Sequence, residues 1–81
     1  MVAQDDAIAA VLMDLAKRRG PEKSFCPSEA ARVIGDEWRD LMPDVRRVAA
    51  GLPLLATQKG HPVDPLTARG PIRLRLHPKQ D

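Results

Sequence analysis

Aromatic side chains are almost absent from this sequence. Its 81 residues contain one phenylalanine, Phe25, one tryptophan, Trp38, and no tyrosine. This scarcity argues against the rows of aromatic platforms on which single-stranded nucleic acids stack. Because 43% of the residues are nevertheless apolar, the core must be built from leucine, valine, isoleucine and alanine.

Cysteine and long apolar runs are equally scarce. The single cysteine, Cys26, excludes an internal disulfide, so stability must come from the core, as suits a reducing compartment. No segment approaches the roughly 18 apolar residues of a membrane span. Asp5 and Asp6 stand where a secretory signal would be basic. We therefore expect a cytoplasmic protein that makes no membrane contact.

The chain length fits one small domain. About 60% of the unfolded surface is buried when a chain of this size folds, which is enough for one core. Residues 1–76 contain all the periodic apolar patterns, so we expect them to form a single domain. Residues 77–81 lack apolar side chains and are expected to be a frayed tail.

Charge is distributed unevenly although the net charge is only +2. Residues 1–44 hold six basic and nine acidic side chains, a net charge of −3. Residues 45–81 hold seven basic and two acidic side chains, a net charge of +5. A cationic half raises the local concentration of phosphates around it, whereas the ordinary alternative is a solvated surface. Both interpretations stay open on composition alone.

Apolar residues repeated at helical spacing predict the first two helices. Residues 5–19 carry apolar side chains at i, i+3, i+4 and i+7 counted from Ile8, and Gly20 ends this helix. Residues 27–34 predict a second helix of about two turns, since Pro27 suits a first helical turn.

A proline divides the segment that follows. Asp36 is placed to cap a short helical turn, which Pro43 is expected to interrupt before restarting the chain as the third main helix. That helix again has apolar residues at helical spacing from Val45, and Gly51 and Pro53 end it.

The remaining apolar segments predict strands. Residues 23–25 are expected to form a short strand because the chain before a proline is pushed toward extended geometry. Residues 54–58 predict a second strand, and residues 59–70 a loop broken by glycine and proline. Residues 72–76 alternate strictly, which predicts a last strand with one buried face and two arginines exposed to solvent.

The order of these elements predicts an α+β fold, a winged helix-turn-helix with three main helices, a short first strand and a C-terminal β-hairpin wing. In that architecture the third helix enters the DNA major groove and the hairpin loop forms the wing. A small α+β domain of another topology is the alternative.

Four sequence strings carry a family resemblance: SFCPSEAARVIG, EWRDLMPDVRRVA, TQKGHPVDP and GPIRLRL. They span residues 24–76 and resemble a small bacterial family of domains of unknown function, itself similar to winged-helix DNA-binding domains. The resemblance implies the winged-helix fold more than a function. One departure is that family members carry an additional helical turn between RRVA and TQ. Here Gly51 and Pro53 end the third helix early, which limits its reach into a groove.

Six cations on the third helix, wing and last strand predict a DNA-binding surface: Arg46, Arg47, Lys59, Arg69, Arg73 and Arg75. They would contact the phosphate backbone of double-stranded DNA, with the two helical arginines in the major groove, as in a small transcription regulator or accessory protein. A homodimer is possible because one short helix reads few bases.

Each of these arginines is, by itself, an ordinary surface charge, and Arg46 or Arg47 is also placed to pair with Asp44. The alternative function is a protein-interaction module in which the arginines meet carboxylates of a partner and no nucleic acid is bound.

Chemistry beyond binding has little support. Cys26 precedes a helix N-terminus, where a thiolate can be reactive, but a small buried hydrophobe beneath the hairpin is the favoured interpretation. A Cys26–His61 pair has no third orienting group, and adding Asp64 or His77 gives no metal-ligand spacing. We expect no enzyme activity, no cofactor and no metal, and we expect Trp38 to lie in the core.

Overall fold

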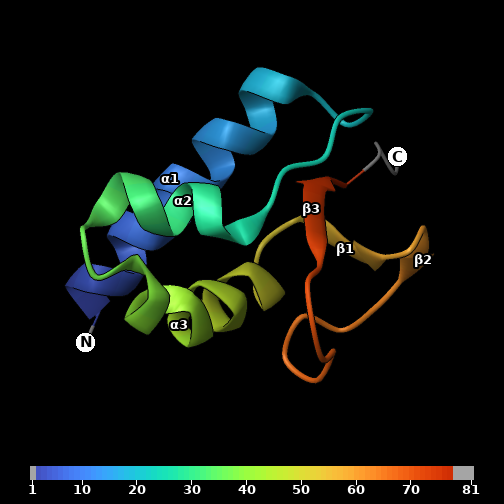
Figure 1. The fold of residues 1–81 in the computed structure, drawn as a ribbon. Coiled ribbons are helices and arrows are strands. Elements are labelled where there is room, and N and C mark those ends of the chain that lie inside the picture. Colours follow the sequence, from blue (N-terminus) through green and yellow to red (C-terminus); the bar gives the residue numbers. More distant parts are fainter. Residues whose placement is uncertain (1, 78–81) are drawn as a thin grey trace.

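Three helices precede a small antiparallel sheet in the computed structural model, which describes residues 2–77 (Figure 1). The elements are α1 (Val2–Arg19), α2 (Pro27–Ile34), α3 (Trp38–Ala50), β1 (Leu54–Gln58), β2 (His61–Pro62) and β3 (Arg73–Leu76). The predicted α+β class is confirmed, and the arrangement is compatible with a winged helix.

The first two helices match their predictions closely. Helix α1 starts three residues before the expected position and ends at Gly20, whose φ of +79° suits glycine. The Gly20 amide donates to the carbonyl of Ala16 at 2.9 Å. Helix α2 has the predicted bounds, and the Glu29 carboxylate accepts the Cys26 amide at 3.2 Å, which satisfies a donor ahead of the first turn.

The prediction that Pro43 interrupts the chain is wrong. Helix α3 runs without a break from Trp38 to Ala50, with Pro43 inside it and Glu37 rather than Asp36 at the N-cap. Because proline has no N–H group, Pro43 removes one donor from the helical hydrogen bonds. Pro43 lies in the second turn of α3, just after the first four amides of the helix, which have no helical partner in any case. The helix therefore tolerates Pro43 and presents one continuous face.

The expected loop of residues 59–70 contains a strand that sequence analysis missed. Lys59 and Gly60 have φ angles of +53° and +84°, the paired positive values of a tight two-residue hairpin turn. This turn brings β2 back along β1, with His61 opposite Gln58, and gives the sheet order β2-β1-β3. The hairpin was missed because Lys-Gly is not among the usual turn pairs.

The short strand predicted at residues 23–25 is reduced to one bridge. Phe25 and Leu74 exchange two backbone hydrogen bonds of 2.7 and 2.8 Å. The bridge attaches the segment before α2 to the free side of β3, where the first strand of a winged helix pairs. On its other side β3 pairs with β1, and Leu54 lies opposite Leu76.

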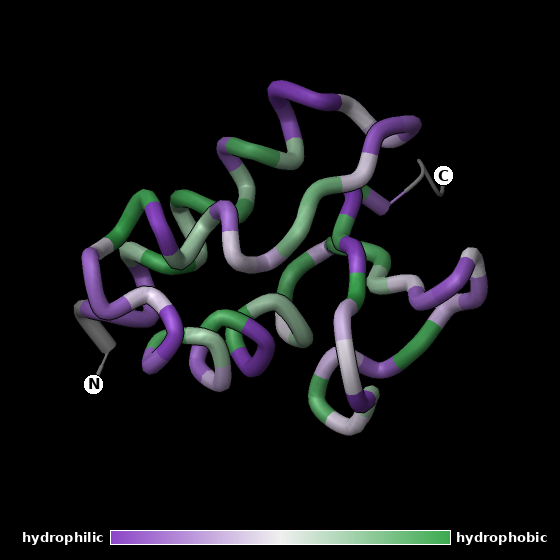
Figure 2. The backbone as a smooth tube through the Cα atoms, in the orientation of Figure 1, coloured by the Kyte–Doolittle hydropathy of each residue, from purple (hydrophilic) through white to green (hydrophobic). Residues whose placement is uncertain are grey.

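The three helices pack with one another, and α1 packs against β3. Hydrophobic and hydrophilic residues alternate along the helices (Figure 2), and α2 and α3 are clearly amphipathic. The buried core is aliphatic apart from Phe25: Ile8, Leu12, Ala16, Ala30, Ala31, Val45, Ala49, Ala56, Ile72 and Leu74 complete it. The prediction of an aliphatic core is confirmed.

The sheet remains attached at its C-terminal end. The amide of His77 donates to the carbonyl of Pro53 at 3.0 Å, one residue beyond the predicted end of the domain. The rest of the expected tail, residues 78–81, lies outside the described residues. Between residues 2 and 77 no helix has the length and apolar character needed to cross a membrane.

Candidate nucleic-acid interface

The six cations predicted to bind DNA fall into three pairs with different surroundings. The two arginines of α3 are held by other parts of the chain, the two arginines of β3 bind backbone, and Lys59 and Arg69 are exposed on the wing. The wing here means residues 59–72, which connect β1 to β3 and include β2.

Arg46 fastens the wing to α3. Its half-buried guanidinium group donates to the carbonyl of Ala68 at 2.7 Å and to that of Gly70 at 2.6 Å. Gln58 completes the attachment from β1, since its amide nitrogen donates to the carbonyls of Arg69 and Pro71. Four successive carbonyls are thus bound alternately by two side chains. Arg46 is a structural residue in this arrangement, and Gln58 gave no sequence signal.

Arg47 joins α3 to α1 rather than pointing freely into solvent. It forms two 2.9 Å hydrogen bonds with the carboxylate of Asp5 and one of 3.2 Å with Asp44. The expected pairing with Asp44 is confirmed, whereas the partner on α1 lies 42 positions away and was not foreseen. The hydrogen bonds from Arg47 lower the pKa of Asp5, and the carboxylates of Asp5 and Asp44 raise the pKa of Arg47.

The arginines of β3 do not offer two free guanidinium groups to solvent, contrary to the prediction. Arg73 is exposed, but its Nε donates to the hydroxyl of Ser24 at 3.0 Å and one terminal nitrogen to the Ser24 carbonyl at 2.9 Å. Arg75 is half-buried and donates to the carbonyl of Pro21 at 3.2 Å. The segment before α2 covers this face of the strand and accepts hydrogen bonds from both arginines, whereas the buried Nε of Arg75 has no hydrogen-bond partner among the described residues.

Lys59 and Arg69 are the two predicted cations whose exposed side chains form no hydrogen bond or ion pair within residues 2–77. The backbone at Lys59 and the backbone at Arg69 lie close in space, because both are next to Gln58. Lys59 follows Gln58 in the hairpin turn, and the Gln58 side chain donates a hydrogen bond to the Arg69 carbonyl. Arg73 is in register with Thr57, one residue before Gln58. Three exposed cations therefore surround the end of β1.

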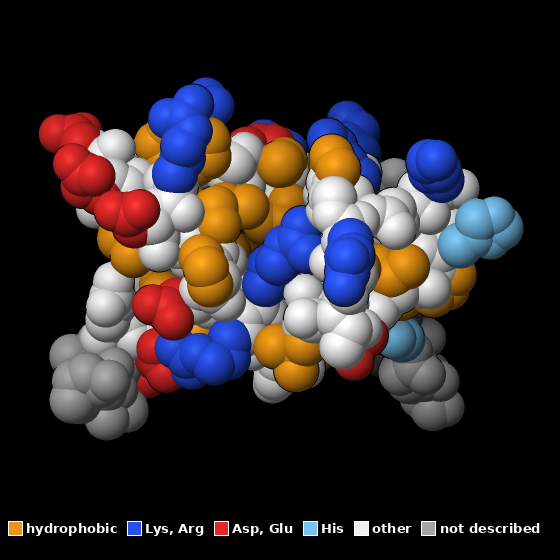
Figure 3. All heavy atoms as spheres, turned by 60° about the horizontal axis from the view of Figure 1, so that its bottom comes forward, with side chains coloured by type: hydrophobic (Ala, Val, Ile, Leu, Met, Phe, Trp, Pro, Cys, Tyr) orange, Lys and Arg blue, Asp and Glu red, His pale blue; other side chains and the backbone are white. Residues whose placement is uncertain are grey.

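Negative charge is sparse around these cations. Asp64 is the only acidic residue from position 45 to 77, and one of its carboxylate oxygens accepts a hydrogen bond from the amide of Leu66 at 2.8 Å. Figure 3 shows one face of the molecule, and most of the acidic side chains visible there gather at one end, to the left in the view. Cationic side chains occur at both ends in this view (Figure 3), so the acidic charge is concentrated at one end while the cationic charge is spread more widely.

Two further arginines form a cluster that sequence analysis did not single out. The guanidinium carbons of Arg32 and Arg39 each lie 4.5 Å from the ring centroid of Trp38. Trp38 is half-buried and packs against the core, in partial agreement with its expected core position. Acidic Asp36, Glu37 and Asp40 lie beside this cluster in the sequence, so its surroundings are not simply cationic.

Cys26 is half-buried at the start of α2, not a fully buried hydrophobe beneath the hairpin as favoured above. The residue before Pro27 has to stay extended to begin the helix, which brings its thiol to the margin of the core. Its sulfur accepts a hydrogen bond from the Ser28 hydroxyl at 3.1 Å. Histidine, cysteine and acidic side chains form no group of three suited to a metal ion among residues 2–77.

Comparison with curated proteins gives no match to this chain. A family match does exist, and it extends from the first helix to the last strand. It covers residues 5–77 and so includes every cation discussed above. The chain therefore belongs to the family described as protein of unknown function (DUF3253).

Proposed function

We propose that this domain binds double-stranded DNA, as a small regulator or accessory protein, mainly through phosphate contacts made by its wing. The observation that carries the proposal is the group of three exposed cations around the end of β1: Lys59, Arg69 and Arg73. Lys59 and Arg69 on the wing and Arg73 at the start of β3 would neutralise phosphates without reading sequence. Two copies on neighbouring sites would supply a longer footprint than one wing.

Helix α3 plays a smaller part in this proposal than the sequence suggested. Arg47 would have to exchange two carboxylates for a phosphate, and Arg46 would have to release the wing. The exposed side of α3 also carries Asp40, which repels phosphate. The wing is therefore the leading contact, and the short α3 supports it.

Fluorescence anisotropy with a labelled, mixed-sequence 25-base-pair duplex tests the proposal. Three phosphate contacts give a slope of log affinity against log salt of about −2.7, so binding should weaken about 40-fold between roughly 50 and 200 mM salt. Replacing Lys59 and Arg69 by glutamine should leave one contact, a slope of about −0.9 and a weakening of only about threefold to fourfold.

A control variant distinguishes the loss of the wing contacts from a general loss of positive charge as the cause of weaker DNA binding. Replacing Lys17 and Arg18 by glutamine removes an equal number of charges from exposed positions on α1, where Arg18 pairs with Asp14 at 3.1 Å. This variant should retain most of the affinity and a slope close to that of the parent. Equal losses in both double variants would contradict wing binding. A salt-independent signal, or no binding at about 50 mM salt, would favour the protein-interaction alternative instead.

A further inference from the structure

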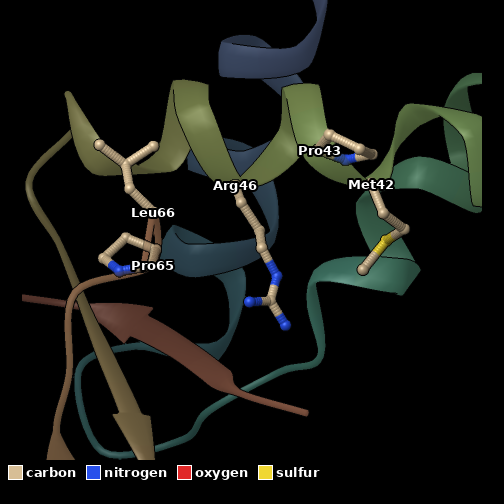
Figure 4. Close-up of a pocket in the computed structure, with 5 residues that line it drawn as sticks. All are labelled: Met42, Pro43, Arg46, Pro65 and Leu66. Atoms are coloured by element: carbon tan, nitrogen blue, oxygen red, sulfur yellow. The ribbon is translucent and has the colours of Figure 1, made fainter. Parts of the chain in front are cut away.

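An open groove separates α3 from the wing. It has a volume of about 320 Å³ and is lined by Met42, Pro43, Arg46, Pro65 and Leu66 (Figure 4). Four of the five lining residues are apolar, and the guanidinium group of Arg46 extends from α3 toward the wing between them. The groove therefore combines an apolar wall with one fixed positive charge.

The charge of Arg46 has no carboxylate partner among the described residues. Its two hydrogen bonds go to the neutral carbonyls of Ala68 and Gly70, which use two of the five N–H donors of a guanidinium group. Arg19, which is similarly half-buried, pairs with Glu29 at 2.6 Å. A partly desolvated charge is stabilised by an opposite charge, so the groove favours an anionic group.

The apolar wall is exposed but held in position. The side chain of Leu66 is 59% exposed, one of two large hydrophobic residues so exposed in the described chain. Its amide is fixed by the Asp64 carboxylate, and the carbonyl of Asp64 accepts the amides of Thr67 and Ala68 at 3.1 and 2.9 Å. Because the backbone around Leu66 is already ordered by these hydrogen bonds, covering its side chain costs little additional backbone freedom.

We propose that this groove binds a segment of another protein that carries a carboxylate near an apolar side chain. The carboxylate would accept the remaining donors of Arg46, and the apolar side chain would cover Leu66 and Met42. A protein segment fits better than a free small molecule, because an open groove cannot enclose most of a small ligand's surface. This surface is distinct from the cations of the proposed DNA contact and does not depend on it.

Short peptides provide the probe. In an extended peptide, side chains two positions apart lie on the same face, so the probe is acetyl-Ser-Leu-Ser-Glu-Ser-amide. Titration followed by ¹⁵N-resolved NMR should shift the amides of Leu66, Ala68 and Gly70, with a dissociation constant on the order of 1 mM. Peptides with glutamine in place of glutamate, or alanine in place of leucine, should bind at least about fivefold more weakly.

Variants of the exposed leucine keep the test independent of folding. Leu66→Ala should weaken peptide binding about fivefold, whereas Val33→Ala, which alters the other exposed hydrophobic residue (66%), should leave it unchanged. Arg46→Lys keeps the positive charge but loses the guanidinium fork, so it should reduce, without abolishing, the preference for glutamate over glutamine.

Three outcomes would overturn the proposal. The first is equal binding of the glutamate and glutamine peptides, and the second is no shift of the groove amides at about 5 mM peptide. The third is that the 25-base-pair duplex shifts the NMR signals of the same amides and that Leu66→Ala also loses affinity for the duplex. This result would assign the groove to DNA. Failure of the DNA proposal is recognised separately, by variants of Lys59 and Arg69.

Discussion

Replacing Arg46 by methionine tests whether this arginine supports the fold or belongs to a free surface. Methionine keeps the apolar stem of the side chain on α3 but removes both hydrogen bonds to the wing. The carbonyls of Ala68 and Gly70 would then lose their charged donor, and residues 68–71 would be held mainly by Gln58.

The expected loss follows from the exposure of the two bonds. A hydrogen bond to a charged group contributes about 1.5–3 kcal/mol, and solvent reduces this value where water can replace the donor. Taking about 1.5 kcal/mol for the part-buried bond to Ala68 and about 0.5 kcal/mol for the exposed bond to Gly70 gives about 2 kcal/mol. In a domain of this size, that loss lowers the melting temperature by about 8–16 °C.

Urea unfolding followed by the fluorescence of Trp38 measures this loss directly. The free energy of unfolding should fall by about 2 kcal/mol without a change in the denaturant slope. Arg69→Met is the matched control, because the Arg69 side chain is exposed and forms no hydrogen bond or ion pair in residues 2–77, and it should stay within about 0.5 kcal/mol of the parent. An Arg46→Met protein as stable as that control would refute the structural role of Arg46.

Three further predictions concern the core, the acid response and the hairpin. Phe25→Ala removes the largest buried side chain at a cost of about 3–5 kcal/mol, and circular dichroism should find most of the protein unfolded at 25 °C. The hydrogen bond from Arg19 lowers the pKa of Glu29 below its ordinary 4.5, so the ionised Glu29 stabilises the fold above that pH and this stabilisation is lost as pH falls through the folded-state pKa. Glu29→Gln should therefore make the free energy of unfolding less dependent on pH in the acid range. An unchanged pH dependence would contradict this. Gly60→Ala places a Cβ at a φ of +84° and should cost about 1 kcal/mol in urea unfolding, whereas Gly35→Ala, at an extended φ of −171° with open space around it, should cost much less.

Local patterns in the sequence predicted the elements that depend on local chemistry. The bounds of α2 followed from Pro27 and Gly35, and those of β1 from an apolar segment between turn residues. Hydrophobic spacing reports which face of a helix is buried, and this is why the aliphatic core was recoverable. Pro43 misled the prediction because its cost depends on how far it lies from the helix N-terminus, and that start was itself misplaced.

The candidate site was much less predictable than the fold. The partners of Arg46 lie 22 and 24 residues away, and Asp5 lies 42 residues from Arg47. Side-chain partners at such separations are set by how helices and loops pack, which no periodic pattern encodes. The sequence identified the cationic half correctly, but it did not separate the arginines that hold the structure together from the cations that remain exposed.

The alternating attachment of residues 68–71 determines where the wing can change length. Even-numbered carbonyls face Arg46 and odd-numbered carbonyls face Gln58. These residues lead directly into β3, whose pairing with β1 fixes their place, so an insertion before residue 68 would lengthen the loop and leave the four hydrogen bonds intact. An insertion within residues 68–71 would disturb the alternation and displace Gly70, whose φ is +83°. Length variation among functional wings of this type is therefore expected before residue 68 and not within residues 68–71.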